Sequence, residues 1–96
     1  MRVRYTPRAS TDLQRIHAFI AENNPAAAAR VIGIIRTRAA SLGDFPEIGH
    51  RSDEPEVRLL LALPYPYRIY YRIGGDEIAI LHIRHTARRA PAPGEL

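Results

Sequence analysis

The feature that most constrains this chain is a turn between two runs of strand-forming residues in its second half. The run PYPYRIYYRI precedes Gly74-Gly75-Asp76, and the run IAILHIRHTAR follows it closely. β-Branched and aromatic residues on both sides of a glycine turn predict a β-hairpin, which here extends from Pro64 to Arg88. Arginines and histidines occupy many positions within these strands. So much guanidinium, phenol and imidazole is unusual for a purely structural sheet.

The first half of the chain predicts a short strand and two helices. The strand covers Met1 to Tyr5. Thr6-Pro7 and Asn24-Pro25 each combine a helix-capping side chain with a proline suited to the first helical position. The helices are expected to end near Glu22 and Leu42, and they must fold back on each other because only two or three residues join them. The apolar stripe of the first helix consists of Ala9, Leu13, Ile16, Phe19 and Ile20.

A loop and three returning strands complete the predicted fold. Gly43 is expected to end the second helix in the left-handed conformation. Residues 44–56 are typical of a loop, which Phe45 and Ile48 are expected to attach to the core. Strands are predicted over about 57–62, 67–73 and 77–84. This order (β-α-α-β-β-β) predicts an α+β fold, in which the N-terminal strand joins an antiparallel three-stranded meander and the helical hairpin covers one sheet face.

The length of 96 residues indicates a single domain, formed by residues 1–88, with residues 89–96 as a flexible C-terminal tail. The sequence contains no cysteine, which excludes disulfides and thiolate metal sites. No apolar run approaches the roughly 20 residues of a membrane helix. We therefore expect a cytoplasmic protein with no membrane partner.

All 14 basic residues are arginine. A GC-rich genome favours arginine codons, but the planar guanidinium group also suits the binding of carboxylates and phosphates. Between residues 57 and 89, six arginines accompany only two acidic residues. The second half of the chain is therefore expected to present a basic surface to a polyanion or an acidic partner.

Alternation along the hairpin strands divides these residues between two faces. On the first strand the polar set is Arg68, Tyr70 and Arg72, and the apolar set is Tyr67, Ile69, Tyr71 and Ile73. We expect the apolar set to face the helices and the polar set to be exposed. On the last strand His82 and Arg84 share one face and His85 lies on the other, so alternation leaves open which histidine joins the exposed set. Both also fit structural roles, with His82 partly buried and His85 bonded to local backbone.

Several features occur in a characteristic order: the succession of elements, the opening TPRA…DL..I..FI…NP.AA, the loop L..FP..GHR, the hairpin PYRIYYRI and the ending I.ILHIRHTAR. Together they resemble the RelE/ParE superfamily of bacterial toxins, over about Val3 to Arg88. The resemblance implies the toxin component of a type II toxin–antitoxin module. The long helical hairpin, the NP opening of the second helix and the LHIRHTAR ending are more similar to the ParE branch.

The ParE-like interpretation implies a protein that inhibits DNA gyrase and carries no catalytic residue, cofactor or metal. Its partners would be gyrase and a cognate antitoxin, with operator DNA reached only through the antitoxin. The antitoxin is expected to bind as a disordered acidic segment that folds along the toxin. The residues expected to bind partners are Arg58, Arg68, Tyr70, Arg72, His82, Arg84 and Arg88.

A RelE-like interpretation implies instead a metal-independent endonuclease that cuts mRNA in the ribosome. Such cleavage needs a base for the ribose 2′-OH, a cation for the phosphorane and an acid for the leaving oxygen. The residues of suitable type are Arg68, Tyr70, Arg84, His85 and Arg88. A third interpretation is an inactive toxin relic that only binds the antitoxin.

Overall fold

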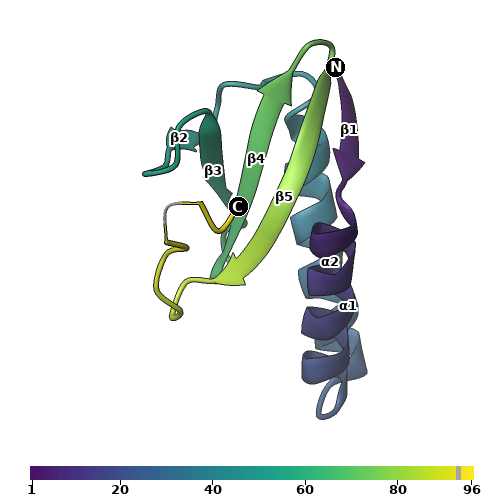
Figure 1. Ribbon diagram of the computed structural model, residues 1–96. Coiled ribbons are helices and arrows are strands. Elements are labelled where there is room, and N and C mark those ends of the chain that lie inside the picture. The colour runs from purple at the N-terminus through teal and green to yellow at the C-terminus, as the bar shows by residue number, and fades with distance from the viewer. Residues whose placement is uncertain (93) are drawn as a thin grey trace.

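The computed structural model describes residues 1–92 and 94–96, and its elements follow the predicted order. They are the strand β1 (Arg2–Tyr5), the helices α1 (Pro7–Ala21) and α2 (Pro25–Ser41), and the strands β2 (His50–Arg51), β3 (Val57–Leu61), β4 (Tyr67–Gly74) and β5 (Glu77–His85). All five strands form one sheet in the order β1-β5-β4-β3-β2 (Figure 1). The α+β class is confirmed, and β2 is an additional short strand inside the predicted loop.

Both helices begin at the predicted caps. The side-chain oxygen of Thr6 accepts a hydrogen bond from the backbone N–H of Ala9 at 3.2 Å, and the Oδ1 atom of Asn24 accepts one from Ala27 at 3.0 Å. Figure 1 shows the helices side by side, with their connecting loop projecting beyond the end of the sheet. Phe19, near this projecting end, is 74% exposed, so its predicted place in the apolar stripe is wrong. The sheet does not extend far enough to cover it.

The core lies between the helical hairpin and one face of the sheet. Its larger members come from both helices and from the three longest strands: Leu13, Val31, Ile35, Leu60, Ile69, Tyr71, Ile78, Ile80 and Ile83. Tyr67 also belongs to this cluster, and Ile73 packs against it. The apolar set of β4 therefore faces the helices, as alternation predicts.

The edge strand β1 runs parallel to β5 and covers only half of it. Arg2 to Tyr5 pair with Glu77 to Ile80, after which the chain turns into α1. The Nε atom of Arg4 donates a hydrogen bond to the Glu77 carboxylate at 2.5 Å. This bond is the main cause that lowers the pKa of Glu77. The far half of β5 has no strand neighbour on that side, and residues of α1 lie beside it instead.

The loop after α2 is held by a tyrosine rather than by the two apolar residues predicted for that role. Phe45 and Ile48 are 61% and 53% exposed, so they do not attach the loop to the core. Instead, the Tyr71 hydroxyl accepts a hydrogen bond from the backbone N–H of Gly49 at 2.9 Å and donates one to the carbonyl of Pro46 at 2.8 Å. Burial is the main cause that raises the pKa of Tyr71.

Gly43 is required for a close approach, and the prediction of a left-handed conformation for it is wrong. Among the described residues, the glycines with positive φ are Gly75 and Gly94. A Cβ atom on Gly43 would lie 2.7 Å from the backbone oxygen of Met1. The N-terminal ammonium group also donates to the Gly43 carbonyl at 2.7 Å. This glycine therefore lets the start of β1 pass close to the end of α2.

The chain after β5 forms no helix or strand in its described part and turns back beside the sheet (Figure 1). The Nη1 atom of Arg8 donates to the backbone carbonyl of Glu95 at 2.7 Å, and the N–H of Gly94 donates to the Glu54 carboxylate at 2.7 Å. Residue 93 of the predicted tail lies outside the described residues. The flexibility of residues 89–96 stays a prediction.

None of the helices in the described chain is long and apolar enough to cross a membrane.

Candidate functional site

A β-bulge determines which side chains share the sheet face that points away from the helices. Tyr70 of β4 pairs with His82 of β5, but the next residue, Tyr71, pairs with Ile80. Leu81 is therefore an extra residue on β5, and it reverses the alternation beyond that point. Side chains directly opposite each other on an antiparallel pair share a face.

The bulge places His82 and Arg84 with the polar set of β4. Arg68 pairs with Arg84, and Tyr70 pairs with His82, on the face opposite the core. His85 pairs with Tyr67 on the other face, where the two rings meet edge to face with centroids 5.2 Å apart. Alternation left open which histidine shares a face with the polar set of β4, and the structure shows that it is His82.

This face is more enclosed than the sequence predicts. Tyr70, expected to be exposed, is only 2% exposed, while His82 is 4% and Arg84 is 8% exposed. The rings of Tyr70 and His82 stack with centroids 6.1 Å apart. Residues 90, 91 and 96 of the C-terminal segment line a small pocket together with Tyr70, so this segment covers part of the face. The prediction of an exposed Tyr70 is wrong because the chain returns over it.

Asp12 of α1 holds His82 in place and was not singled out from the sequence. Its Oδ2 atom lies 2.6 Å from Nδ1 of His82 and accepts a hydrogen bond from the backbone N–H of Ile83 at 3.0 Å. That N–H belongs to the half of β5 that β1 does not cover. The Asp12 carboxylate thus replaces a missing strand partner and orients a buried imidazole.

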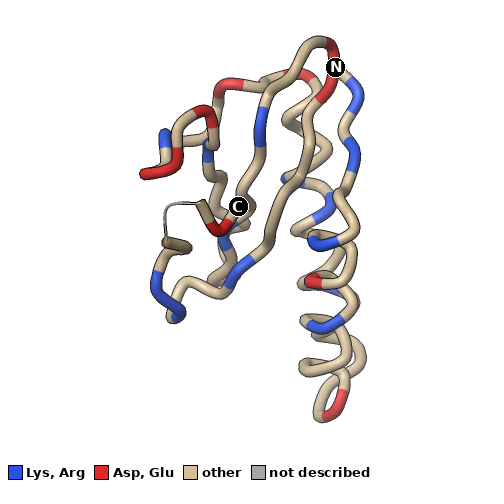
Figure 2. Tube along the Cα trace, viewed as in Figure 1, with Lys and Arg blue, Asp and Glu red and all other residues tan. Residues whose placement is uncertain are grey.

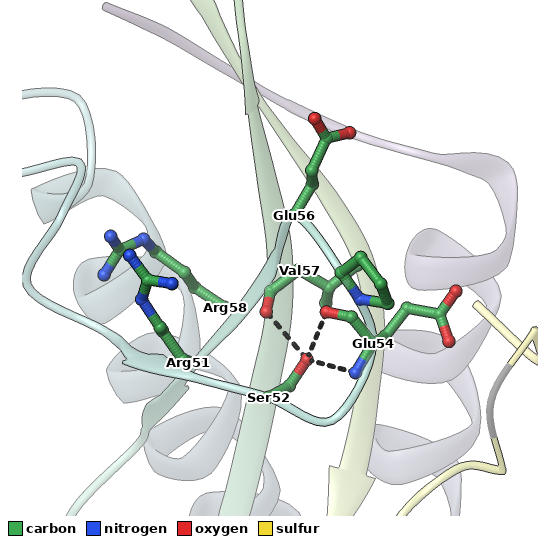
Figure 3. A pocket seen from close by; sticks show the side chains of 7 residues that line it. Arg51, Ser52, Glu54, Glu56, Val57 and Arg58 are labelled. Atoms are coloured by element: carbon green, nitrogen blue, oxygen red, sulfur yellow. Dashed lines mark hydrogen bonds between the residues drawn. The ribbon is translucent and has the colours of Figure 1, made fainter.

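A second basic site lies at the opposite edge of the sheet, where Arg51 of β2 pairs with Arg58 of β3. Figure 3 shows their two guanidinium groups pointing to the same side of the turn that joins these strands. The hydroxyl of Ser52 closes this turn by donating to the carbonyl of Val57 at 2.7 Å and accepting from the backbone N–H of Glu54 at 3.1 Å. Like charges opposite each other on a ladder repel, so this pair favours an incoming carboxylate.

The structure separates Arg58 from the other predicted partner-binding residues. Arg58 pairs with Tyr71, whose side chain faces the core, and donates to the carbonyl of Gly49 at 3.0 Å. Arg68 donates to the carbonyl of Arg88 at 3.3 Å. The acceptors in these contacts are backbone oxygens. Arg51 was not predicted, because β2 itself was not.

Residues 3–90 match the family model described as the ParE toxin of the type II toxin–antitoxin system, parDE. The chain belongs to this family. The RelE/ParE resemblance drawn from the sequence is therefore confirmed. Membership of this type II toxin–antitoxin family implies an antitoxin partner.

Two curated relatives and one solved structure are similar to this ParE-family toxin over most of their length. "Putative toxin Y4kP" of Sinorhizobium fredii is 37% identical over 90 residues, covering 94% of this chain and 93% of the relative. "Toxin RelE2" of Caulobacter vibrioides is 38% identical over 84 residues, covering 88% and 93%. A chain of the chromosomal ParDE system from P. aeruginosa superposes with a TM-score of 0.79 at 27% identity, covering 88% of this chain and 95% of its own.

The ParE-family toxin does not bring the predicted nuclease set together on one face. Arg68, Tyr70 and Arg84 share the face away from the helices, whereas His85 lies on the helix side. The Nδ1 atom of His85 accepts a hydrogen bond from the N–H of Ala87 at 2.9 Å, which is the local role that the sequence also allowed. Arg88 follows the end of β5. Within the described chain, no group of three or more His, Cys, Asp or Glu residues is placed to hold a metal ion.

Proposed function

We propose that this toxin stops growth by inhibiting DNA gyrase. The observation that carries the proposal is the match of residues 3–90 to the ParE toxin family. The burial of Tyr70 and His82 supports it, because RNA cleavage needs an accessible stacking surface and an accessible acid or base. The orientation of His85 toward the helix side supports it further.

Expression of this chain without its antitoxin is expected to stop growth, and the purified toxin is expected to inhibit supercoiling by gyrase. Cellular transcripts should stay intact. Relaxed plasmid incubated with gyrase, ATP and increasing amounts of toxin, followed by gel electrophoresis, measures the effect. Supercoiling that is unchanged at a molar excess of toxin would contradict the proposal. Growth that stays normal would favour the inactive relic.

A RelE-like endonuclease is the second candidate function, and two observations favour it. Relatives named RelE2 and RelE3 are 38% and 31% identical to this chain. In addition, the Asp12–His82 contact resembles the pairing that orients a general acid or base, and Arg84 lies two residues beyond His82 on the same face. Cuts mapped within translated codons, lost in a His82→Gln variant that still folds, would establish this function in place of gyrase inhibition.

For neutralisation, we propose that Arg51 and Arg58 bind carboxylates of an acidic antitoxin segment. Their guanidinium groups lie on neighbouring strands, and Arg51 is exposed. Arg68 and Arg72, both half-buried on the sheet face that points away from the helices, are proposed as further contacts along the sheet. A disordered acidic segment that orders on binding can reach both sites.

Replacing Arg51 with glutamate is expected to weaken antitoxin binding by about tenfold, because the new charge repels the segment and leaves its carboxylate without a partner. The dissociation constant, measured by isothermal titration calorimetry with the purified antitoxin, tests this. Arg30→Glu is the matched control, since Arg30 is also an exposed arginine and lies on α2. Equal losses in the two variants would mean that only net charge matters and that the Arg51 site is not the contact.

A further inference from the structure

A basic pocket of about 360 Å³ lies between α1 and the end of β5. Its lining residues are Arg8, Thr11, Asp12, Arg15, His82, Arg84 and Arg88. Figure 2 shows arginine positions on α1 and near the end of β5 on the two sides of this region. The one acidic group in the lining, Asp12, already accepts from His82 and Ile83. The lining of the pocket therefore has four arginines and one carboxylate, which leaves an excess of positive charge.

Two of its side chains carry buried nitrogen atoms that have no hydrogen-bond partner among the described residues. Arg84 is 8% exposed, and its Nε and Nη1 atoms are buried with no hydrogen-bond partner among residues 1–92 and 94–96. Nε2 of His82, which is 4% exposed, also has no partner there, and because Nδ1 faces the Asp12 carboxylate this nitrogen is a donor only in the protonated ring. Buried charged donors without partners are costly. Such groups at the wall of a basic pocket indicate a ligand with several acceptor oxygens.

The C-terminal segment brings a carboxylate to this pocket, but this carboxylate does not form a hydrogen bond with Arg84. The Oε2 atom of Glu95 lies 3.6 Å from Nη1 of Arg84, which is too far for a hydrogen bond. Arg8 donates to the backbone carbonyl of Glu95, so this residue is held at the rim by the pocket's own arginines. A single carboxylate is therefore attracted here, but it leaves the buried donors of Arg84 unpaired.

We propose that this pocket binds a phosphate dianion, either free or as the terminal group of a small phosphate monoester. A phosphate dianion carries about two negative charges and three strong acceptor oxygens, which suits several arginines better than a carboxylate does. The fork of Arg84 can donate to two of its oxygens, while Arg8 and Arg88 compensate its charge from the exposed rim. Neither Arg51 nor Arg58 lines this pocket, so it is distinct from the Arg51–Arg58 site.

Titration of ¹⁵N-labelled toxin with inorganic phosphate, with adenosine 5′-monophosphate and with acetate, at constant ionic strength, tests the proposal. Saturable shifts of the Arg84 Nε–H signal and of the His82 ring signals are expected with the phosphate probes, with at least about tenfold weaker binding of acetate. Tighter binding of the nucleotide than of phosphate would identify a monoester as the ligand, and the reverse would identify the free ion. Shifts that do not saturate, or equal affinity for acetate, would overturn the proposal.

Three variants sharpen the test. Arg8→Gln, at an exposed position, is expected to weaken phosphate binding by about threefold, and Glu95→Gln to tighten it by about two- to fivefold by removing the competing carboxylate. Arg84→Gln should abolish binding if it folds, which its amide spectrum reports. Arg30→Gln is the matched control and should bind phosphate as the unmodified toxin does. Unchanged affinity in both the Arg8 and the Glu95 variants would overturn the assignment even if Arg84→Gln is unfolded.

Discussion

Replacing Gly49 with alanine is expected to destabilise the fold by about 3 kcal/mol or more. The added Cβ would lie 2.5 Å from the Tyr71 hydroxyl oxygen and 2.7 Å from the backbone carbonyl oxygen of Leu59. Tyr71 is fully buried and Leu59 belongs to β3, so neither neighbour is free to move away. The clash would also break the hydrogen bond that joins the Gly49 N–H to Tyr71. Urea denaturation followed by circular dichroism measures the loss.

The matched control is Gly33→Ala on the exposed side of α2. A Cβ at Gly33 meets no atom within 4 Å, and the residue is exposed within the helix. Alanine is there expected to stabilise the protein by up to about 1 kcal/mol, because glycine is a poor helix former. The two glycine substitutions should therefore change stability in opposite directions. Equal midpoints for the two variants would show that the loop accommodates a Cβ at position 49.

The parts of the fold that the sequence predicts well are those determined by near neighbours. Thr6 and Asn24 each accept a hydrogen bond from a residue three positions later, so the helix starts can be predicted from a few adjacent letters. The short connection between the helices requires an antiparallel hairpin for the same local reason. The glycine turn of the β-hairpin likewise places Gly75 at a positive φ.

The bulge at Leu81 could not be predicted, because it depends on which residues of β4 and β5 face each other. Strict alternation puts His82 on the same face as Ile80, whereas the extra residue moves it to the opposite face beside Tyr70. The two faces of β5 are both largely apolar near this point, so the residue types do not reveal the shift. A register change of one position exchanges the two faces of a strand. For this reason the sequence predicts which residue types form the candidate site, but it does not predict which of them share a sheet face.

The contacts that complete the site join residues far apart in the chain, which is why the sequence did not indicate them. Asp12 and His82 are 70 positions apart, and Arg8 and Glu95 are 87 positions apart. Asp12 lies outside the apolar stripe of the first helix, as polar helix residues usually do. Its role appears only because β1 ends at Tyr5 and leaves the second half of β5 without a strand partner.

Replacing Asp12 with alanine is expected to cost about 3 kcal/mol of stability. The substitution removes the acceptor for two donors at once, the Nδ1 atom of His82 and the backbone N–H of Ile83. Both donors would then be left in a largely buried region without a protein partner, and this penalty exceeds the value of the bonds themselves. Urea denaturation gives the change in stability, and hydrogen exchange at the Ile83 amide reports directly on the uncovered edge of β5.

Two variants separate this role of Asp12 from a general effect of charge. Asp12→Asn keeps one acceptor oxygen in the same place, so it should retain the bond to Ile83 and lose only about 1 kcal/mol. Asp44→Ala removes an exposed carboxylate beyond the end of α2 and should change stability by less than about 0.5 kcal/mol. If Asp12→Ala were no more costly than Asp44→Ala, the carboxylate would not be what holds β5 and His82 against α1. A large loss of stability in Asp12→Ala, together with fast hydrogen exchange at the Ile83 amide, would show that α1 takes the place of a neighbouring strand beside β5.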